Sequence, residues 1–522
     1  MSESRYDVIL AGSGLAALST AARLVELGIK KIGVFAPAFG GTPYIAAINF
    51  VLPDNPYGDT PEQYYRDMLE AGYWLNDRDL VKEMISKTVE GYELLCRWGV
   101  RFARTAGGDL LRRHASGSSC PRSLCSTTEL IGAHIERTLR TSLIGKGVEF
   151  NLSSEVVNLI TINDHIAGVV VRDGNGQIST KYASTVIAGW GGVGTLLGKS
   201  TYPADVNGRT LGIAFNAGVK LTDLEFLEYE PMVVLHPEEA FGEPCPTAML
   251  GEGAYLLNAN NERFLLQYRP QGEAGAPKTL INKAIWKEID AGRGSEHGGA
   301  YVDLRHIDRK ILKAYPWFYK RLESNGIDPN EQLIEVGPVP HSFSGGIKVD
   351  NGCRSSLSGL YAVGEAAAGF HGACRMAGNA ASQAVLSGMM CAEAIAKDGI
   401  EPLQEYSSTV AYGEDLHVRM KYAAYIDRAS KALGIYRNEK DLLNALLLLE
   451  KAKANSDDLK RDTFTEQRYL SVSLMLTAAL ARKESRGTHL RTDYPEMSKE
   501  YERSIVLYRD SHGEIAFEKQ AI

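Results

Sequence analysis

An arginine among small residues is the most unusual chemical feature of this chain. Arg375 lies in HGACRMAGN (371–379), within the run GLYAVGEAAAGFHGACRMAGNAASQAVLSG (359–388). Glycine is used where backbones pack closely or approach a ligand, and a guanidinium is rarely buried without a partner. We therefore expect Arg375 either to face a substrate anion or carbonyl as a bidentate donor, or to pair with Glu365 or a backbone carbonyl.

The N-terminal segment has a pattern typical of a dinucleotide site. Residues 6–37 contain a short apolar run, then GSGLAA (12–17), a helix-periodic stretch and a second apolar run. Gly12 permits the tight turn, Gly14 lets the backbone approach a pyrophosphate, and Ala17 allows close helix–strand packing. The helix N-terminus offers N–H donors and a positive dipole end. The second strand ends in Ala36 rather than an acid, which favours a flavin over a nicotinamide.

Two more glycine-containing turns follow expected strands. AGWGG (188–192) comes after the strand expected at 185–187, and Gly364-Glu365 comes after the strand expected at 360–363. The second turn precedes a helix of small residues, as a phosphate or ribityl site would. Such turns near both ends of the sequence predict one long cofactor that is contacted by distant segments.

The composition indicates a globular protein of several domains. The chain has 522 residues, of which 44% are hydrophobic and 23% charged, which is enough for two to four domains. The formal net charge of −7 argues against nucleic acid as the main partner, although LLRRHASGSSCPR (110–122) is a local basic patch.

Targeting, membrane and metal signals are missing from the sequence. MSESRYDVIL does not have the basic and apolar regions of a signal peptide, and the uncharged run 32–53 is broken by prolines and a glycine pair. The seven cysteines form no CxxC and show no iron–sulfur or zinc spacing. We expect a cytoplasmic protein with reduced thiols, no transmembrane segment and no metal site.

The coarse element pattern is that of an α/β protein. Helices are expected over 59–145, strands over 148–192 with an Asn-Gly turn at 175–176, and mixed elements over 224–340. From about 400 to the end the pattern predicts helices, with LLNALLLLE and YLSVSLMLTAALAR as apolar-faced segments.

Five stretches resemble, in this order, the flavoprotein family that holds succinate dehydrogenase, fumarate reductase and L-aspartate oxidase. They are the N-terminal GSGLAAL, DTPEQYYRDMLEAGYWLNDRDLV (59–81), DLEFLEYEP (223–231), HSFSGGIKVD with GLYAVGEAAAGFHGACRMAGN (341–379), and ESRGTHLRTDYP (484–495). The resemblance extends over nearly the whole chain.

The resemblance implies an α/β fold with three parts. These are a discontinuous Rossmann-like FAD-binding domain (1–223 and 341–399), an α+β capping domain (224–340) and a C-terminal helical domain (400–522). It also implies hydride transfer between flavin N5 and a substrate C–C bond next to a carboxyl or carbonyl group. By position, Glu365 would bind the flavin ribityl chain, while His341 and Arg375 would hold a substrate carboxylate.

Combined with the motifs, the resemblance gives two sets of candidate site residues. The expected FAD-binding residues are Gly12, Gly14, Leu15, Ala16, Ala36, Gly41, Thr42, Ala188, Gly189, Gly364, Glu365, Asn379 and Ala380. The expected catalytic residues are Arg375, His341, Glu230, Glu252 and Tyr229, with Tyr255 as a further candidate acid.

The chain departs from the family in three places. The loop GGTPYIAAIN (40–49) has no histidine for a covalent flavin, so we expect non-covalent FAD. The substrate-binding HPT triplet becomes EPM (230–232), unless an insertion restores it at His236. Leu250 replaces the arginine of RGEGG, which shuttles the proton in fumarate reduction.

These departures predict an altered substrate. Glu230 adds an anion where a dicarboxylate would bind, and Leu250 cannot donate a proton. We expect negligible turnover of fumarate, succinate and L-aspartate, and a bulkier or less charged substrate with an apolar part near Met232, Met249 and Leu250.

Three functions fit the sequence. The first is an FAD-dependent dehydrogenase or reductase acting on a small molecule with a carboxylate or carbonyl. The alternatives are a divergent L-aspartate oxidase and an electron-relay flavoprotein subunit that works with an iron–sulfur or other electron-transfer protein.

Overall fold

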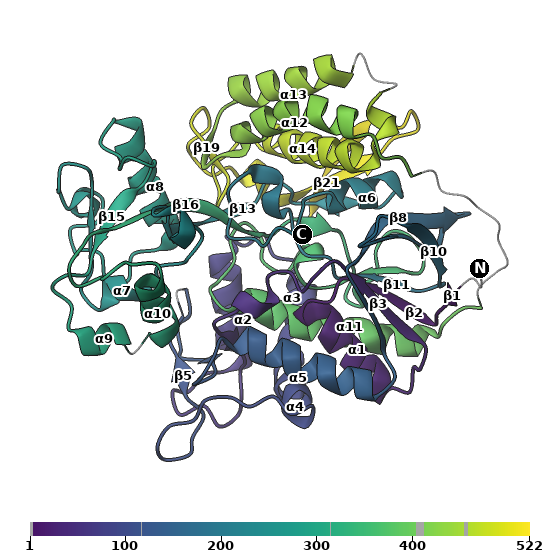
Figure 1. Cartoon of the computed structure of the whole chain (residues 1–522), viewed down its shortest axis with the longest axis horizontal. Coiled ribbons are helices and arrows are strands. Elements are labelled where there is room, and N and C mark those ends of the chain that lie inside the picture. The colour runs from purple at the N-terminus through teal and green to yellow at the C-terminus, as the bar shows by residue number, and fades with distance from the viewer. Residues whose placement is uncertain (1–3, 116, 314, 403–411, 454–457) are drawn as a thin grey trace. The chain divides into compact units, whose positions relative to one another are not determined.

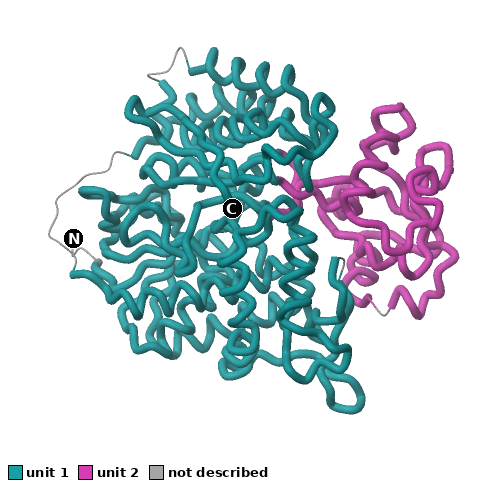
Figure 2. The backbone as a smooth tube through the Cα atoms, turned by 180° about the vertical axis from the view of Figure 1, so that it is seen from behind, with its two compact units in different colours: residues 1–197, 203–226, 343–522 teal, residues 198–202, 227–342 magenta. Residues whose placement is uncertain are grey.

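The protein is described by a computed structural model that covers residues 4–115, 117–313, 315–402, 412–453 and 458–522 (Figure 1). The chain divides into two compact units (Figure 2). Unit 1 holds residues 1–197, 203–226 and 343–522, and unit 2 holds residues 198–202 and 227–342. Residues 412 onward thus belong to unit 1, and their standing as a separate domain stays a prediction.

A five-stranded parallel sheet is the central layer of unit 1. Its spatial order is β18 (Leu360–Ala362), β11 (Val186–Ala188), β2 (Val8–Ala11), β3 (Ile32–Ala36) and β7 (Glu149–Leu152). The first four strands are fully buried apolar runs, as expected for parallel strands covered on both faces. Ala362 pairs with Ala188, which pairs with Ala11. The carboxyl ends of these strands therefore meet at one edge, as the glycine-rich turns require.

Helices α1 (Leu15–Glu26), α5 (Ile131–Gly145) and α11 (Asn379–Asp398) lie along one face of this sheet (Figure 1). Small residues bring α1 and α11 together. A Cβ on Gly388 would lie 2.8 Å from Ala16 O, and a Cβ on Gly364 would lie 2.7 Å from Ala16 Cβ. Part of the small-residue run 359–388 therefore serves helix packing.

An antiparallel sheet lies on the other side of the central strands in Figure 1. Its order is β1 (Ser4–Arg5), β10 (Ile178–Tyr182), β9 (His165–Asp173) and β8 (Ser154–Ile162). Asp173 N donates to Gln177 O at 3.0 Å, and Gly176 has φ +82°. The strands and the Asn-Gly turn expected over 148–192 are therefore confirmed.

The segment between β3 and α5 is helical over 61–97 but not over 98–130, so the helices expected over 59–145 are confirmed only in part. It contains α2 (Pro61–Ala71), α3 (Arg78–Ser86) and α4 (Thr88–Arg97), and a small sheet of β4 (Ile48–Asn49), β6 (Ser123–Leu124) and β5 (Arg112–Arg113). Thr60 caps α2 by accepting from Gln63 N at 3.1 Å, with Pro61 as the first helical residue. The start signal read from the sequence is therefore confirmed.

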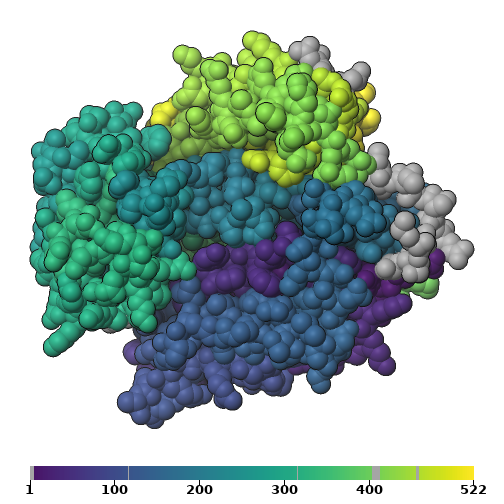
Figure 3. Space-filling model, viewed as in Figure 1, coloured from purple at the N-terminus to yellow at the C-terminus, as the bar shows by residue number. Residues whose placement is uncertain are grey.

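The C-terminal segment is helical only in part. Helices α12 (Leu416–Ser430), α13 (Glu439–Lys453) and α14 (Thr463–Ala481) form the green-to-yellow surface of unit 1 in Figure 3. The helical prediction is wrong beyond them, because β21 (Arg503–Arg509) and β22 (Ile515–Ala521) form a hairpin. Asp510 and Gly513 make its turn, with Gly513 at φ +83°. The hairpin extends a sheet with β12 (Leu221–Thr222) and β17 (Gly346–Ile347).

Unit 2 is an α+β unit with its own apolar core. Its sheet order is β13 (Leu227–Val234), β16 (Ile334–Phe343), β15 (Ala300–Asp303) and β14 (Tyr255–Leu257). Its helices are α7 (Ala248–Gly251), α8 (Lys278–Asp290), α9 (Arg309–Lys313) and α10 (Pro316–Ser324).

Unit 1 also contains α6 (Thr210–Asn216) and the short pair β19 (Tyr436–Arg437) and β20 (Leu490–Arg491).

All seven cysteines are free thiols. Within the described ranges, no helix has both the length and the apolar character needed to cross a membrane.

Candidate functional site

The glycine-rich turn after β2 is shaped by a close strand–strand approach. Gly12 has φ +117°, and a Cβ there would lie 2.2 Å from Gly189 O. Gly12 N donates to Phe35 O at 2.8 Å, and Gly189 N donates to Ala11 O at 2.9 Å. The two expected cofactor segments, 12–17 and 188–189, therefore lie side by side at the carboxyl edge of the sheet, where open α/β sheets bind their ligands.

The N-terminus of α1 faces the same edge. Gly14 is its N-cap and brings no side chain, while Leu15 N donates to Thr42 Oγ1 at 2.8 Å. Thr42 is the first residue of the short 3₁₀ helix η1 (Thr42–Tyr44), and Gly41 is the N-cap of that helix. Helix α1 has twelve residues, and its first turn carries no acidic side chain. Its N-terminus therefore presents free N–H groups and the positive end of the helix dipole to a phosphate.

The two later turns also come together. Glu365 Oε1 accepts from Phe343 N at 2.9 Å, and a Cβ on Gly192 would lie 2.8 Å from the Glu365 carboxyl carbon. The elbow 188–192 and the 3₁₀ turn η5 (Gly364–Ala366) are thus neighbours, as the sequence suggested. The role of Glu365 toward a ribityl chain stays a prediction.

A buried hydrogen-bond donor with no protein partner lies at the start of α11. Asn379 is 1% exposed. Its Oδ1 accepts from Asn49 Nδ2 at 2.6 Å and from Tyr64 OH at 2.8 Å. Among the described residues, its Nδ2 has no partner. A buried donor left open is costly, so Asn379 fits a site that is completed by a bound polar group such as FAD.

The guanidinium of Arg375 is hydrogen-bonded to the backbone of the small-residue segment. It is 9% exposed, and its Nη1 donates to Met376 O at 3.2 Å. Burial and the charge of Arg375 lower the pKa of nearby His371 to about 3. His371 Nε2 lies 2.8 Å from Gln383 Oε1, while Gln383 Nε2 donates to Gly364 O and Ala367 O. His371, which sequence reasoning missed, is therefore a neutral donor to Gln383 beside the guanidinium.

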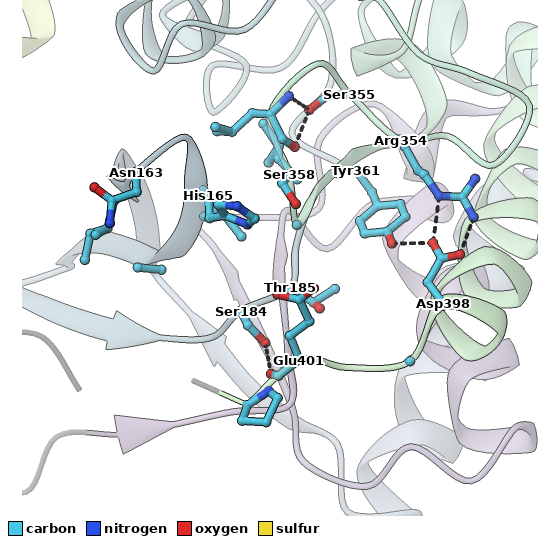
Figure 4. Close-up of a pocket in the computed structure, with 18 residues that line it drawn as sticks. Asn163, His165, Ser184, Thr185, Arg354, Ser355, Ser358, Tyr361, Asp398 and Glu401 are labelled. Carbon is cyan, nitrogen blue, oxygen red and sulfur yellow. Dashed lines mark hydrogen bonds and ion pairs between the residues drawn. The ribbon is translucent and has the colours of Figure 1, made fainter. Parts of the chain in front are cut away.

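A cavity of about 520 Å³ lies at the opposite edge of the sheet (Figure 4). It is lined by residues at the amino ends of β11 and β18, including Ser184, Thr185 and Gly359. Three of its polar side chains pair with one another, since Asp398 accepts from Arg354 at 2.6 Å and from Tyr361 at 3.1 Å. Because ligands bind at the carboxyl edge in such sheets, we do not assign this cavity to the reaction.

Unit 2 gathers a polar cluster on one face of its sheet. Glu228 and Glu230 alternate on β13, which puts both on the same face. His341 on β16 has Nε2 3.9 Å from Glu230 Oε2, and its Nδ1 lies 2.8 Å from Thr201 Oγ1. Lys278 Nζ lies 2.5 Å from Glu230 Oε2 and 3.9 Å from Glu228 Oε1. We call Glu228, Glu230, Lys278 and His341 the cap cluster.

The cap cluster corrects the charge argument made from the sequence. The sequence alone predicts an uncompensated negative charge at Glu230, whereas this carboxylate pairs with the ammonium of Lys278. Glu228, Glu230 and His341 could each offer a ligand atom within 4.8 Å of one another. The ammonium lies against Glu230 where an ion would have to bind, so we assign no metal to them. Sequence reasoning missed Lys278 because its partners lie on a distant strand.

The other cap candidates lie elsewhere in unit 2. The Tyr229 side chain leaves the strand on the face opposite to Glu230, and its carbonyl accepts from Asn282 at 2.8 Å. Glu252 is exposed and accepts from Tyr315 OH at 3.1 Å. Tyr255 stacks on His306 with centroids 4.3 Å apart. The catalytic roles of Tyr229 and Glu252 stay predictions.

The prediction of an apolar contact surface for the substrate is wrong. Met232, Met249 and Leu250 are 0%, 0% and 2% exposed and pack in the core of unit 2. His236 stacks on His297 with ring centroids 4.5 Å apart. These positions support the unit rather than present a binding surface.

A buried ionic network holds two of the sequence stretches that carry the resemblance. Glu225 Oε1 accepts from Arg482 Nε at 2.5 Å, and Glu484 Oε1 accepts from Arg482 Nη1 at 3.0 Å. Arg486 Nε donates to the same Glu484 oxygen at 2.7 Å. Glu225 of the first stretch and Glu484 of the second are therefore joined by Arg482 inside unit 1, in a structural role.

Comparisons with known proteins agree with this geometry. The family profile described as the FAD binding domain matches residues 7–381, and that of the fumarate reductase flavoprotein C-terminus matches residues 466–522. The chain is 28% identical to a subunit of the fumarate reductase (CoM/CoB) of Methanothermobacter marburgensis, over 96% of this chain and 97% of the relative. It is 31% identical to L-aspartate oxidase of Pyrococcus abyssi, over 96% of this chain and 98% of the relative.

A solved structure shows the same fold. A point mutant of E. coli quinol fumarate reductase FrdA aligns with a TM-score of 0.84 at 23% identity, over 100% of this chain and 97% of that one. The α/β architecture, the FAD cofactor and the enzyme class expected from the sequence are thus confirmed. The chain belongs to the family of FAD-dependent oxidoreductases that contains the flavoproteins of fumarate reductase and succinate dehydrogenase and L-aspartate oxidase.

Proposed function

We propose that the protein transfers a hydride between FAD and a substrate C–C bond next to a carboxyl or carbonyl group. The observation that carries this proposal is Arg375, a guanidinium set in the segment that leads into α11, beside a neutral histidine. His371 therefore adds no second positive charge beside this guanidinium. When bound, FAD supplies or accepts the hydride.

The protein groups divide the remaining tasks. In this proposal Arg375 binds and orients the carboxylate or carbonyl through its planar pair of donors. His341, oriented by Thr201, is a second donor to the substrate. Glu230 takes part in proton transfer. The FAD is held without a covalent bond, because the loop 40–49 has no histidine.

Two alternative functions are tested in the same experiment. L-aspartate oxidation is supported by the Pyrococcus abyssi relative, and it needs the same carboxylate contact with a C–N bond as the site of oxidation. An electron-relay role with an iron–sulfur protein is supported by the relative whose name marks it as a subunit. Lys278 also removes the electrostatic objection to a dicarboxylate, so fumarate and L-aspartate belong among the substrates tested.

The deciding experiment is photoreduction of the protein-bound flavin without oxygen, followed by reoxidation with a panel of enoates, enones and imines. Fast reoxidation by an enoate or enone, with the saturated product formed, supports the proposal. Reoxidation by imines, with oxidation of L-aspartate by the oxidised protein, favours the oxidase. A flavin that reacts with no member of the panel but with an iron–sulfur protein contradicts the proposal and supports the relay.

A further inference from the structure

A buried glutamine holds the turn that carries Glu365. Gln383 lies in the second turn of α11 and is 2% exposed. Its Nε2 donates to Gly364 O at 2.8 Å and to Ala367 O at 2.9 Å, which precede and follow Glu365 in the chain. One turn further along α11, Ser387 Oγ accepts from Gly364 N at 2.9 Å. Helix α11 therefore fixes this turn through three hydrogen bonds.

His371 fixes the direction of this amide. It is 5% exposed, and its Nε2 lies 2.8 Å from Gln383 Oε1. Both amide hydrogens are used by backbone carbonyl groups, so the amide meets the imidazole through its acceptor oxygen. If the amide turned over, Oε1 would lie against two carbonyl oxygens. The imidazole therefore carries a proton on Nε2 and donates it to the hydrogen bond.

The backbone on both sides of His371 is anchored to the segment that follows α2. Asn76 is fully buried, and its Nδ2 donates to Phe370 O at 2.9 Å. Ala373 N donates to Gly72 O at 2.9 Å. The imidazole lies between these two anchored points of its own backbone, so it is a fixed donor for the amide.

These hydrogen bonds join two parts of the candidate site within unit 1. Glu365 belongs to the turn at one end, and Arg375 follows His371 by four residues in the loop at the other end. The core does not need polar groups here, because the neighbouring α11 residues Ala384 and Val385 are buried and apolar. A buried polar network whose members are paired specifies one arrangement and makes it rigid.

We propose that His371 and Gln383 are positioning residues, and this rests on the proposed function. They hold the Glu365 turn and the Arg375 loop in one fixed arrangement. The group that binds the flavin and the group that binds the substrate carboxylate thereby keep a constant separation and orientation, on which the rate of hydride transfer depends. Neither His371 nor Gln383 transfers a proton in this role.

The test uses the FAD-loaded full chain, reduced with dithionite and mixed either with fumarate, crotonate or 2-cyclohexenone, or with ferricenium. Ferricenium takes single electrons from a flavin and needs no bound orientation. His371→Leu and Gln383→Met should slow reoxidation by the enoate or enone about 10²-fold and leave the ferricenium rate unchanged. His371→Gln returns an N–H donor and should recover most of the lost rate. His417→Leu, on the exposed side of α12, is the matched control and should behave as wild type.

Two results would overturn the assignment: a wild-type enoate or enone rate in His371→Leu, or equal losses with these probes and with ferricenium, which would indicate general damage. If the wild-type protein reacts with no enoate or enone, the proposed function fails instead. The hydrogen bonds are then tested without catalysis, by amide hydrogen exchange of the oxidised, FAD-loaded protein. The amides of Gly364 and Ala367 should exchange about fivefold faster in Gln383→Met, as expected for loss of one hydrogen bond. Unchanged exchange would refute the positioning of this turn.

Discussion

The imidazole beside Arg375 does not add a second positive charge. His371 lies beside it, and burial together with the guanidinium lowers the pKa of that imidazole to about 3. A second cation therefore does not form at neutral pH. A substrate carboxylate would be oriented by the geometry of one planar donor, and this geometry distinguishes arginine from lysine.

Substitution of Arg375 tests that geometry. Arg375→Lys keeps the charge but loses the two parallel donors, so it should lower kcat/KM nearly as much as Arg375→Ala. Loss of one partner of a buried charged contact costs about 2–5 kcal/mol, or roughly 30-fold and upward. FAD content should stay unchanged, as in the exposed control Arg101→Lys. Full activity of Arg375→Lys would show that charge alone matters or that the residue is structural.

Asn379 is the residue-scale test of the cofactor site. Asn379→Asp keeps Oδ1 but replaces the open Nδ2 donor with an acceptor, so FAD should bind about tenfold more weakly or worse. Equilibrium dialysis of the apoprotein measures this. Tyr64→Phe is the control, since it removes the bond to Oδ1 but leaves Nδ2 in place, and it should lower stability by about 1 kcal/mol without changing FAD affinity. Equal affinities of Asn379→Asp and wild type would remove Asn379 from the site.

Among the elements, the turn after β12 concentrates buried charge. Asp223 and Glu225 are 2% and 0% exposed, and within the described residues Asp223 Oδ1 and Glu225 Oε2 have no hydrogen-bond partner. Burial, followed by repulsion from Glu225, raises the pKa of Asp223 to about 7. Arg482 opposes this shift and pairs with Glu225. Ser504 of β21 donates to Asp223 Oδ2 at 3.1 Å.

This raised pKa predicts a pH-dependent loss of stability. The folded protein binds the Asp223 proton more tightly than the unfolded chain, whose pKa is near the ordinary 3.8. The stabilisation is fully present below about pH 4 and is lost as the pH rises to about 7. Asp223→Asn mimics the protonated form, so its stability relative to wild type should increase from pH 4 to pH 8 in urea unfolding. Exposed Asp164→Asn is the control, and a difference that does not change with pH would contradict the shift.

At the scale of the whole molecule, the residues expected to bind the cofactor come from distant parts of the sequence. Gly12, Thr42, Gly189, Glu365 and Asn379 all belong to unit 1. The parallel pairing of β2 with β11 and of β11 with β18 brings the strands before Gly12, Gly189 and Glu365 to one edge. FAD bound there would link these segments, so binding is coupled to the stability of the whole unit.

Removal and return of FAD test this coupling. Acid precipitation should release all flavin into the supernatant, because the loop 40–49 offers no histidine for a covalent bond. The apoprotein should then unfold at a lower temperature than the loaded protein. FAD at about 100 times its Kd should restore roughly 2.7 kcal/mol of stability, measured by calorimetry. Flavin that stays with the pellet would contradict the non-covalent assignment.

The sequence predicted the local features that depend on short segments. Gly12 and Gly14 between a strand and a helix predicted the turn that the structure has, and Thr60-Pro61 predicted the start of α2. The turn at Asn175-Gly176 was predicted for the same reason. The hairpin over 503–521 was missed, because its strand β21 is held in a sheet by β12, far away in the chain.

The sequence by itself therefore determined the fold class and the FAD cofactor, and it predicted which residues lie along the cofactor edge. The reason is physical, since glycine turns, helix caps and strand periodicity act over a few neighbouring residues. Only the tertiary structure showed that Gly364 and Gly388 serve α1–α11 packing, that Leu250 is core, and that Lys278 pairs with Glu230. Such relations join residues tens to hundreds of positions apart, and the charge of Glu230 could not be judged before its partner on α8 was known.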